Sequence, residues 1–203
     1  MNAIDPKALR SMLGELSPDE FRRIAREREL AEWAESNKFC GRCGTGMRRG
    51  DNPAENAFVC PSCGYMAFPK ICPAVIVLVT NGDRILLQRN SHYRAANWTL
   101  VAGFVDPGEN LEDAVRREIR EEASIEVKDI RYTRSQAWPF PSNIMIGFTA
   151  EYLSGELRPD GDEVIESGWF TRDGITEIPI KGSIARWMID EWATKPDGSL
   201  LSL

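Results

Sequence analysis

The sequence predicts a mixed α/β or α+β domain over the larger, C-terminal part of the chain, and three observations lead to this prediction. Strand-like segments there are interleaved with helical segments. The length of 203 residues suits one domain with an appendage, or two small domains. A composition of 42% hydrophobic and 28% charged residues is ordinary for a soluble globular protein, and a packed core is feasible at this size.

The first 36 residues are predicted to be helical. Ser17 and Pro18 form a helix start signal, in which a capping side chain is followed by proline at the first helical position. A loose apolar stripe follows at helical spacing and consists of Phe21, Ile24, Leu30 and Trp33. The arginines and glutamates between these residues are expected to form a solvated face.

The larger part of the chain shows elements of both types. Strands are expected at Val75–Thr80, Arg84–Gln88, Trp98–Val101, Ile130–Thr133, Ile144–Tyr152 and Val164–Phe170. Helices are expected at Leu111–Ala123, with Asn110 as its cap, and at Gly182–Thr194. Asn81 and Gly82 favour a type I′ hairpin turn between the first two strands. The segment Gly103–Gly108 is expected to be a loop.

Charge and hydropathy argue against several classes of protein, namely general nucleic-acid binders, membrane proteins and secreted proteins. The net charge of −6 repels nucleic-acid backbones, so sequence-independent binding would need a local basic patch. The longest apolar run, Ala74–Val79, has the length of a strand, so no membrane helix is expected. The segment Met1–Leu16 lacks the features of a secretory signal, and a cytoplasmic protein is expected. The one histidine is His92, which favours carboxylates as acid–base groups.

Four of the five cysteines form two pairs with metal-ligand spacing: Cys40, Cys43, Cys60 and Cys63. A disulfide framework is the alternative, but such frameworks belong to small secreted domains. Two C-x-x-C turns match tetrahedral zinc, because a thiolate at each end of such a turn reaches one ion without strain. We therefore predict a structural Zn²⁺ site. The fifth, Cys72, is expected to be a small buried hydrophobic residue.

The helix expected at Leu111–Ala123 carries a group of acids. Glu118, Glu121 and Glu122 are three and four positions apart, which places them close together at the edge of the apolar stripe. Carboxylates that close repel one another, and a divalent cation with oxygen ligands removes the repulsion. The alternative is a solvated acidic face paired with the arginines of the helix. The loop ahead of the helix, which brings Glu109 to its start, favours the metal site.

The segment from Gly103 to Ile125 resembles the Nudix box, G-x5-E-x7-R-E-U-x-E-E-x-G-U, where U is a bulky aliphatic residue. Every fixed position matches except Ser124, which stands where the box has its final glycine and where glycine relieves a positive φ. The resemblance implies an α/β/α sandwich with a mixed sheet. It also implies hydrolysis of nucleoside diphosphates linked to another group, with Mg²⁺ or Mn²⁺ as cofactor.

The resemblance assigns roles to individual residues. The metal-binding and catalytic glutamates of the family correspond to Glu118, Glu121 and Glu122. The backbone carbonyl of Ala102 matches a further metal ligand. Gly103 opens the box, and Glu109 and Arg117 match a structural pair in which the arginine orients a catalytic glutamate. The implied mechanism is metal-assisted attack of water on one phosphorus, with Glu122 as first choice for the proton acceptor.

A second motif narrows the choice of substrate. Residues 135–142, Ser-Gln-Ala-Trp-Pro-Phe-Pro-Ser, resemble the SQPWPFPxS signature of NADH pyrophosphatases within the Nudix family, with Ala137 in place of the first proline. The prolines hold Trp138 and Phe140 as flat faces able to stack on adenine or nicotinamide. The alternative is an aromatic edge strand that packs on the core. The residues predicted here to bind substrate are Gln136, Ala137, Trp138, Pro139, Phe140, Pro141, Ser142 and Asn143.

Further positions fit the same subfamily, which carries a four-cysteine zinc unit directly ahead of its Nudix domain. Phe68 and Phe104 are aromatic candidates for substrate contact, and Ala185 matches a late substrate-contact position. Glu163 falls where a distant metal-binding glutamate is expected, and its neighbour Glu166 is the rival assignment.

The resemblance implies three regions: an N-terminal helical segment at 1–36, a zinc ribbon at 37–70 and a Nudix hydrolase domain at 71–203. Full-length relatives carry an extra N-terminal domain ahead of the zinc unit. The 39 residues before Cys40 are too few for it, so this domain is expected to be missing. The resemblance also implies a homodimer, and no membrane partner is expected.

The function expected is metal-dependent cleavage of a dinucleotide, NADH or NAD⁺, into AMP and a nicotinamide mononucleotide. Relatives also remove NAD caps from RNA, so NAD-capped RNA is a second expected substrate. One alternative is a broader pyrophosphatase that accepts ADP-ribose and similar nucleoside diphosphate derivatives. Another is a non-enzymatic zinc-ribbon module that binds nucleic acid, against which the acidic charge and the nearly complete box argue.

Overall fold

The computed structural model describes residues 5–52, 55–91 and 97–195, so His92 lies outside the described residues. The chain divides into two compact units. The N-terminal unit contains Met1–Ile71 and the segment Ala137–Asn143; the sandwich unit contains Cys72–Gln136 and Ile144–Leu203. None of the helices in the described part is long and apolar enough to cross a membrane.

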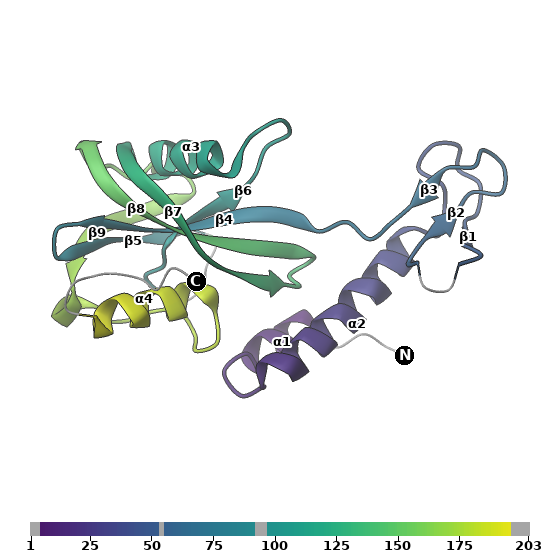
Figure 1. Cartoon of the computed structure of the whole chain (residues 1–203), viewed down its shortest axis with the longest axis horizontal. Helices are drawn as coiled ribbons and strands as arrows, with labels where there is room; N and C mark the ends of the chain where they lie inside the picture. Colours follow the sequence, from purple (N-terminus) through teal and green to yellow (C-terminus); the bar gives the residue numbers. More distant parts are fainter. Residues whose placement is uncertain (1–4, 53–54, 92–96, 196–203) are drawn as a thin grey trace. The chain divides into compact units, whose positions relative to one another are not determined.

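A six-stranded sheet forms the centre of the sandwich unit. Its strands lie in the order β7-β8-β4-β5-β9, and β6 pairs with β4. The bounds are β4 Cys72–Asn81, β5 Arg84–Asn90, β6 Val101–Phe104, β7 Ile125–Trp138, β8 Asn143–Gly155 and β9 Val164–Thr171. Helix α3 (Leu111–Ala123) covers one face and α4 (Ile184–Thr194) the other, and a short 3-10 turn, η1 (Arg172–Gly174), follows β9 (Figure 1). The predicted α/β/α sandwich is confirmed.

Strand β4 is apolar at successive positions because both of its faces are buried. Val75, Val77 and Val79 belong to the apolar cluster beneath α3. Ile76 and Leu78 belong to the cluster beneath α4. Successive strand residues point to opposite faces of a sheet, so a strand between two helical layers needs apolar residues on both. This packing seats α3, the helix with the carboxylates, on the sheet.

The hairpin between β4 and β5 turns one residue later than predicted. Asn81 pairs with Arg84, so Gly82 and Asp83 are its two central residues. Gly82 has a φ of 61°, and Asp83 is not among the residues with positive φ. Positive φ at the first central position alone is the pattern of a type II′ turn rather than type I′.

The strand predicted at Trp98–Val101 was placed too early. Strand β6 begins at Val101 and continues through Gly103, which pairs with Val75 of β4. The start of the predicted loop is therefore strand. Glycine lowered the strand propensity of this segment, but close packing requires glycine there, as described below.

The N-terminal unit contains two helices and a small three-stranded antiparallel sheet. Its elements are α1 Pro6–Ser11, α2 Pro18–Ser36, β1 Arg48–Arg49, β2 Phe58–Val59 and β3 Met66–Ala67. The predicted start of α2 is confirmed: Ser17 caps the helix, and the Glu20 carboxylate accepts a 3.0 Å bond from the Ser17 backbone N–H. Trp33 of α2 packs on Phe58 of β2 with ring centroids 4.7 Å apart, so α2 contacts the small sheet.

The tip of the β7–β8 hairpin completes the core of the N-terminal unit. That core consists of Leu9, Leu13, Phe21 and Ala25 from the helical segment, with Trp138 and Phe140 packed against it. The segment Ala137–Asn143 is thus distant in sequence from the helices but belongs to their compact unit.

Candidate active site and four-cysteine centre

A hollow of about 270 Å³ lies at α3 and β6 of the sandwich unit. It is lined by Ala102, Gly103, Phe104, Asp106, Arg117, Glu118, Glu121, Glu122 and Glu163. Eight of these nine residues had been given a role from the sequence, as part of the Nudix box, as metal ligands or as a substrate contact; Asp106 had not. Glu163, which is 41 positions beyond Glu122, is brought to the same place by β9.

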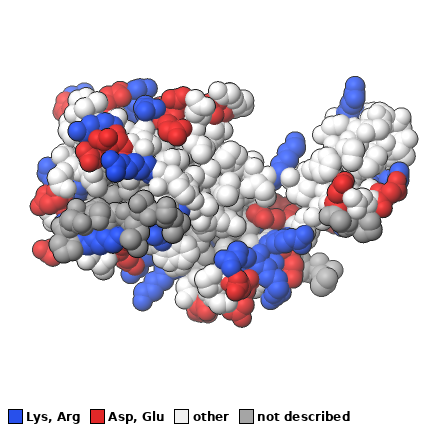
Figure 2. All heavy atoms as spheres, in the orientation of Figure 1, with Lys and Arg blue, Asp and Glu red and all other residues white. Residues whose placement is uncertain are grey.

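Helix α3 has both a solvated charged side and a buried acidic side. On the exposed side, Arg116 pairs with Asp113 at 3.2 Å and Arg120 with Glu126 at 2.7 Å. Figure 2 shows acidic and basic side chains intermixed over the edge of the sandwich unit where α3 lies. The solvated-face alternative therefore describes these residues but does not describe Glu122, which is buried.

Arg117 forms hydrogen bonds with three of the glutamates. Its guanidinium donates two hydrogen bonds to the Glu109 carboxylate, both 2.9 Å long. It also donates to Glu118 at 2.7 Å, to Glu121 at 3.1 Å and to the backbone carbonyl of Phe104 at 2.8 Å. These charge-assisted bonds lower the pKa of Glu109 and raise the pKa of Arg117. The arginine therefore orients acids in the way the resemblance implies.

Gly103 makes room for a carboxylate. A Cβ atom at this position would lie 2.0 Å from the Glu118 Cδ and 2.1 Å from its Oε1. Such distances are far below van der Waals contact, so any other residue would displace Glu118. The first glycine of the box is needed here for close approach, not for a positive φ.

Burial changes the acidity of two of the glutamates. The side chains of Glu118 and Glu122 belong to residues only 8% and 3% exposed. Burial raises the pKa of Glu118, and the bonds from Arg117 oppose this. Burial raises the pKa of Glu122 to about 8, where a hydrogen bond from Gln88 opposes the shift and the charge of Glu118 adds to it. A bound cation would take the place of the proton that burial favours.

Glu163 and its rival Glu166 lie in different surroundings. Glu163 lines the hollow with the box glutamates. Glu166 instead pairs with Arg89 at 3.1 Å on the neighbouring strand. The geometry therefore favours Glu163 as the additional acid of the site.

The donor atoms in the hollow fit a hard divalent cation. Carboxylate oxygens are the ligands that Mg²⁺ and Mn²⁺ prefer. The side-chain carbonyl oxygen of buried Gln88, beside Glu122, has no hydrogen-bond partner among the described residues. Within the described part of the chain, the carboxylates do not converge as closely as a closed ligand set does. This is the open type of site that Mg²⁺ completes with waters and substrate phosphates.

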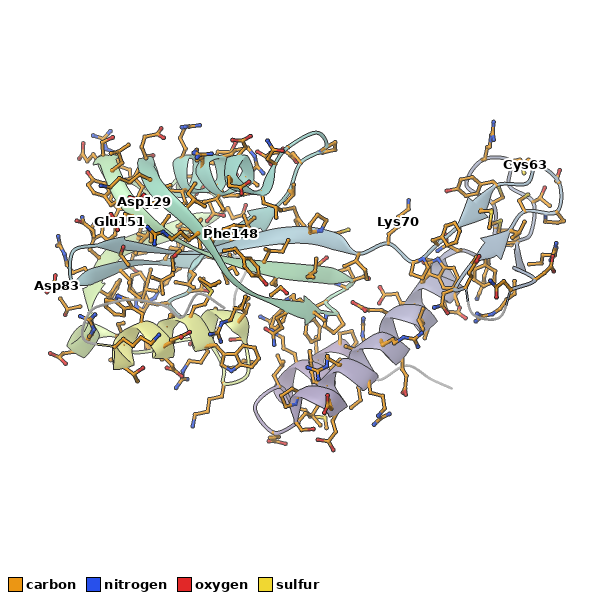
Figure 3. The ribbon with its side chains drawn as sticks, viewed as in Figure 1. Cys63, Lys70, Asp83, Asp129, Phe148 and Glu151 are labelled. Atoms are coloured by element: carbon orange, nitrogen blue, oxygen red, sulfur yellow. The ribbon has the colours of Figure 1, made fainter. Side chains whose placement is uncertain are left out.

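The four predicted zinc ligands face one another in the N-terminal unit. The sulfur atoms of Cys40 and Cys63 are 3.7 Å apart, and those of Cys43 and Cys60 are 3.5 Å apart. A tetrahedral site with zinc–sulfur bonds of about 2.3 Å has edges of roughly 3.8 Å, whereas a disulfide bond is about 2.0 Å long. All four are free thiols whose ligand atoms lie within 4.8 Å of one another. Cys63, one of the four, is labelled in Figure 3.

The two cysteine turns share one backbone construction. The Gly44 N–H donates to the Cys40 carbonyl at 2.8 Å, and the Gly64 N–H donates to the Cys60 carbonyl at 3.0 Å. Both glycines have a positive φ, 75° and 71°, a conformation that only glycine adopts at little cost. The glycine after each pair therefore turns the chain so that both sulfurs of the pair face the centre.

The expectation that Cys72 is buried was wrong. Cys72 is exposed at the first position of β4. The buried part of that strand begins two residues later, at Ala74.

Two of the predicted substrate residues lie at the start of α4. Gln136 is buried; its side-chain amide donates to the Gly182 carbonyl at 2.8 Å and accepts from the Ile184 N–H at 2.7 Å. Ala185 follows directly and packs in the apolar cluster beneath α4. Both polar atoms of Gln136 thus fix the beginning of α4.

The other predicted substrate residues of the motif lie in the N-terminal unit. Trp138 and Phe140 are half-buried and meet edge to face, with ring centroids 5.0 Å apart. Ser142 donates to the Lys70 carbonyl at 3.0 Å. Phe68 of the same unit is 48% exposed, and Phe104 at the hollow is 54% exposed. Among the aromatic residues predicted to bind substrate, Phe68 and Phe104 are therefore exposed, while Trp138 and Phe140 are half-buried.

Two polar residues in apolar surroundings, Gln88 and Arg28, were not predicted from the sequence. Gln88 is fully buried on β5 and donates to Glu122. Arg28 is 7% exposed on α2, so the predicted solvated face is wrong at this position. The signal was present in both cases. Gln88 ends the apolar run Ile85–Leu87, and Arg28 falls at helical spacing from Phe21.

The chain resembles known proteins over most of its length. The NUDIX domain family matches residues 70–189. The NAD-capped RNA hydrolase NudC of Pseudomonas aeruginosa is 41% identical over 181 residues, which are 89% of this chain and 64% of that protein. The protein of the same name from Pseudomonas fluorescens Pf-5 is 39% identical over 189 residues, or 93% of this chain and 68% of that protein. The chain therefore spans roughly two thirds of the length of these curated relatives.

Solved structures agree with the fold. The crystal structure of a NUDIX hydrolase from Nitrosomonas europaea matches with a TM-score of 0.70, covering 82% of this chain and 96% of that one at 23% identity. A MutT NUDIX hydrolase from Burkholderia pseudomallei matches with a TM-score of 0.53, covering 60% of this chain and 97% of that one at 24% identity. The matched domain, the near-complete box and the sandwich fold together show that the chain belongs to the Nudix hydrolase family.

Proposed function

We propose that this chain hydrolyses the diphosphate bond of NADH and NAD⁺ to AMP and a nicotinamide mononucleotide, and that it removes NAD caps from RNA. The observation that carries the proposal is the hollow in which Arg117 holds Glu118 and Glu121 beside the buried Glu122. Relatives of 39–41% identity are named NAD-capped RNA hydrolases, which supports this class of substrate. A cytoplasmic location is part of the proposal.

The size and chemistry of the hollow support the reaction. Its volume of about 270 Å³ suits a diphosphate group rather than a whole dinucleotide. Glu118, Glu121 and Glu122, with Glu163 and the carbonyl of Ala102, would hold Mg²⁺ or Mn²⁺. Such ions neutralise phosphate oxygens and lower the pKa of an attacking water. Glu122 is the proposed general base, because it is a buried carboxylate that lines the hollow beside the other proposed metal ligands.

The substrate contacts belong to the same proposal. Phe104 would stack on a base of the dinucleotide, and Phe68 and the motif residues would add contacts. The motif residues concerned are Gln136, Ala137, Trp138, Pro139, Phe140, Pro141, Ser142 and Asn143. Ala185 stays a predicted substrate-contact position.

The four-cysteine centre is proposed to hold Zn²⁺ as a structural ion. A closed set of four thiolates leaves no position for substrate and stabilises the fold instead. The division into a helical segment at 1–36, a zinc ribbon at 37–70 and a Nudix domain at 71–203 stays a prediction. So does the homodimer, which light scattering of the purified protein tests.

The test is product analysis by chromatography over a panel of NADH, NAD⁺, NAD-capped RNA, ADP-ribose and diadenosine polyphosphates. The metal-loaded protein is expected to release AMP and the reduced nicotinamide mononucleotide from NADH, and to free 5′-monophosphate RNA from capped RNA. Faster cleavage of ADP-ribose than of either would favour the broader pyrophosphatase. Tight binding of RNA in a gel shift without hydrolysis of any compound would favour the nucleic-acid module and contradict the proposal.

A further inference from the structure

A charged side chain is buried within the core of the N-terminal unit. Arg28 lies on α2, seven positions after Phe21 and three after Ala25, and all three are buried. Its place is therefore on the apolar stripe of the helix. Arginine is almost never buried this fully without partners, because burial of an unpaired charge is costly.

The partners of Arg28 are two carbonyls of the hairpin tip. Its Nη1 donates to the Pro139 carbonyl at 2.8 Å and to the Pro141 carbonyl at 3.1 Å. A salt bridge of 2.9 Å to Glu32 balances its charge. Proline has no N–H, so the segment with these two prolines cannot build an ordinary strand ladder, and its carbonyls need donors from elsewhere. One nitrogen of Arg28 supplies both.

The two carbonyls lie on either side of Phe140, next to Trp138. The Phe140 N–H donates to the Trp138 carbonyl at 2.8 Å, which closes a tight turn. The rings of the two residues meet edge to face at 74°. Leu9 and Phe21 belong to the apolar cluster that packs on both rings. The bonds from Arg28 therefore fix the backbone that sets the directions of these rings.

We propose that Arg28 is a positioning residue, which holds the Trp138–Ser142 segment in the conformation that the substrate requires. The α2 helix is then a support for the specificity segment rather than an appendage. This inference rests on the proposed function, because that function gives the segment its contact with substrate. The alternative is a purely structural arginine, whose loss would lower stability without changing substrate recognition.

The first experiment compares Arg28→Met, Arg28→Lys and Arg23→Met in the full-length protein. Methionine keeps most of the apolar stem and removes both hydrogen bonds. Lysine keeps one charged nitrogen with several donors, and because both native bonds come from a single nitrogen, it should restore part of the effect. Arg23, whose side chain is 63% exposed on the same helix, is the matched control.

Hydrogen–deuterium exchange tests the support of the segment without any assay of activity. Arg28→Met should speed exchange in the peptide covering 137–143 by about tenfold, the loss expected for one or two charge-assisted hydrogen bonds. Exchange in α3 should stay at the wild-type rate. An unchanged rate at 137–143, or an equal change in the Arg23→Met protein, would overturn the proposal.

Kinetics with NADH test the consequence for recognition. Arg28→Met should raise KM by about tenfold with little change in kcat, and Arg28→Lys should recover part of the loss. In a double-mutant cycle, Arg28→Met should add little once Trp138→Ala is present, because the arginine acts through that segment. Additive effects, or a loss confined to kcat, would sink the idea. A wild-type protein that cleaves no NADH would refute the proposed function instead, and the exchange experiment would still decide whether Arg28 holds the segment.

Discussion

The four-cysteine centre and the carboxylate hollow are two proposed metal sites of opposite design. In the first, four thiols from two glycine-terminated turns converge within 4.8 Å and form a closed set. In the second, the acids line an open hollow, and their present partners are the side chains of Arg117 and Gln88. One set is complete without any other molecule, and the other leaves room for phosphate oxygens.

Ligand geometry separates a site that stabilises the fold from one that can support catalysis. When a closed tetrahedron of soft ligands binds its ion, the binding free energy stabilises the folded state. An open set of hard ligands binds its ion more weakly, because waters and substrate must complete the shell. Glu122 is buried and Arg117 holds Glu118 and Glu121, so these acids are not a freely solvated face.

The largest effect is expected from breaking the closed site. Cys60→Ser should remove zinc and unfold the ribbon, because apparent zinc-binding free energies in such sites are on the order of 10 kcal/mol. Metal analysis by plasma emission and thermal unfolding measure this. Cys72→Ser is the control, since Cys72 is exposed and outside the centre. A Cys60→Ser protein that retains one zinc per chain would contradict the proposal that all four cysteines form a closed zinc site.

Next in size is the loss of a carboxylate from the open site. Glu122→Gln keeps the shape of the side chain and should lower kcat on NADH by about 10³-fold, with the fold intact. Glu112→Gln, at the exposed start of the same helix, should change kcat little. Steady-state kinetics at saturating Mg²⁺ decide, and a variant that retains near wild-type turnover would remove Glu122 from the site.

A smaller loss of kcat is expected when a side chain is added at Gly103 of the open site. Gly103→Ala places a Cβ against the Glu118 carboxylate, so that carboxylate must move and kcat should fall by about 10²-fold. Gly46→Ala is the control, because its Cβ would have nothing within 4 Å. The crystal structure of the alanine variant should show Glu118 displaced. Unchanged kinetics would show that the position of this carboxylate is not critical.

The smallest effect concerns pH and the free energy of unfolding. Burial raises the pKa of Glu122 from 4.5 to about 8, so across that interval the folded chain keeps a proton that the unfolded chain has released. The unfolding free energy of the Mg²⁺-free protein therefore contains a contribution that falls as pH rises through this interval. Urea titrations of the zinc-loaded protein in buffer without Mg²⁺ should show it, and added Mg²⁺ should reduce it. Glu122→Gln should flatten the dependence; the same slope in both proteins would contradict the assignment.

Local patterns predicted much of the candidate site. The bounds of the helix at Leu111–Ala123 are confirmed, because its apolar stripe and its flanks encode both ends. Ser124 ends it with a φ of 58°, the conformation that the box glycine suggests. The cap was predicted less well: Asn110 stands at the N-cap but makes no capping bond, and its amide binds Asp113 at 3.1 Å instead. A short side chain has several local partners, and sequence does not choose among them.

Periodicity and spacing within short windows predicted a mixed α/β or α+β domain, the acidic helix and the paired cysteines, and the resemblance to the Nudix box implied the sandwich. Contacts across long separations became known only from the folded chain. Gln88 reaches Glu122 over 34 positions, and Arg28 reaches Pro139 over 111. Glu163, already the first assignment from the sequence, lies directly ahead of β9 and lines the hollow, whereas Glu166 on β9 pairs with Arg89. The physical reason is that a buried polar group is stabilised by partners that folding brings near, and those partners leave no trace in the local pattern.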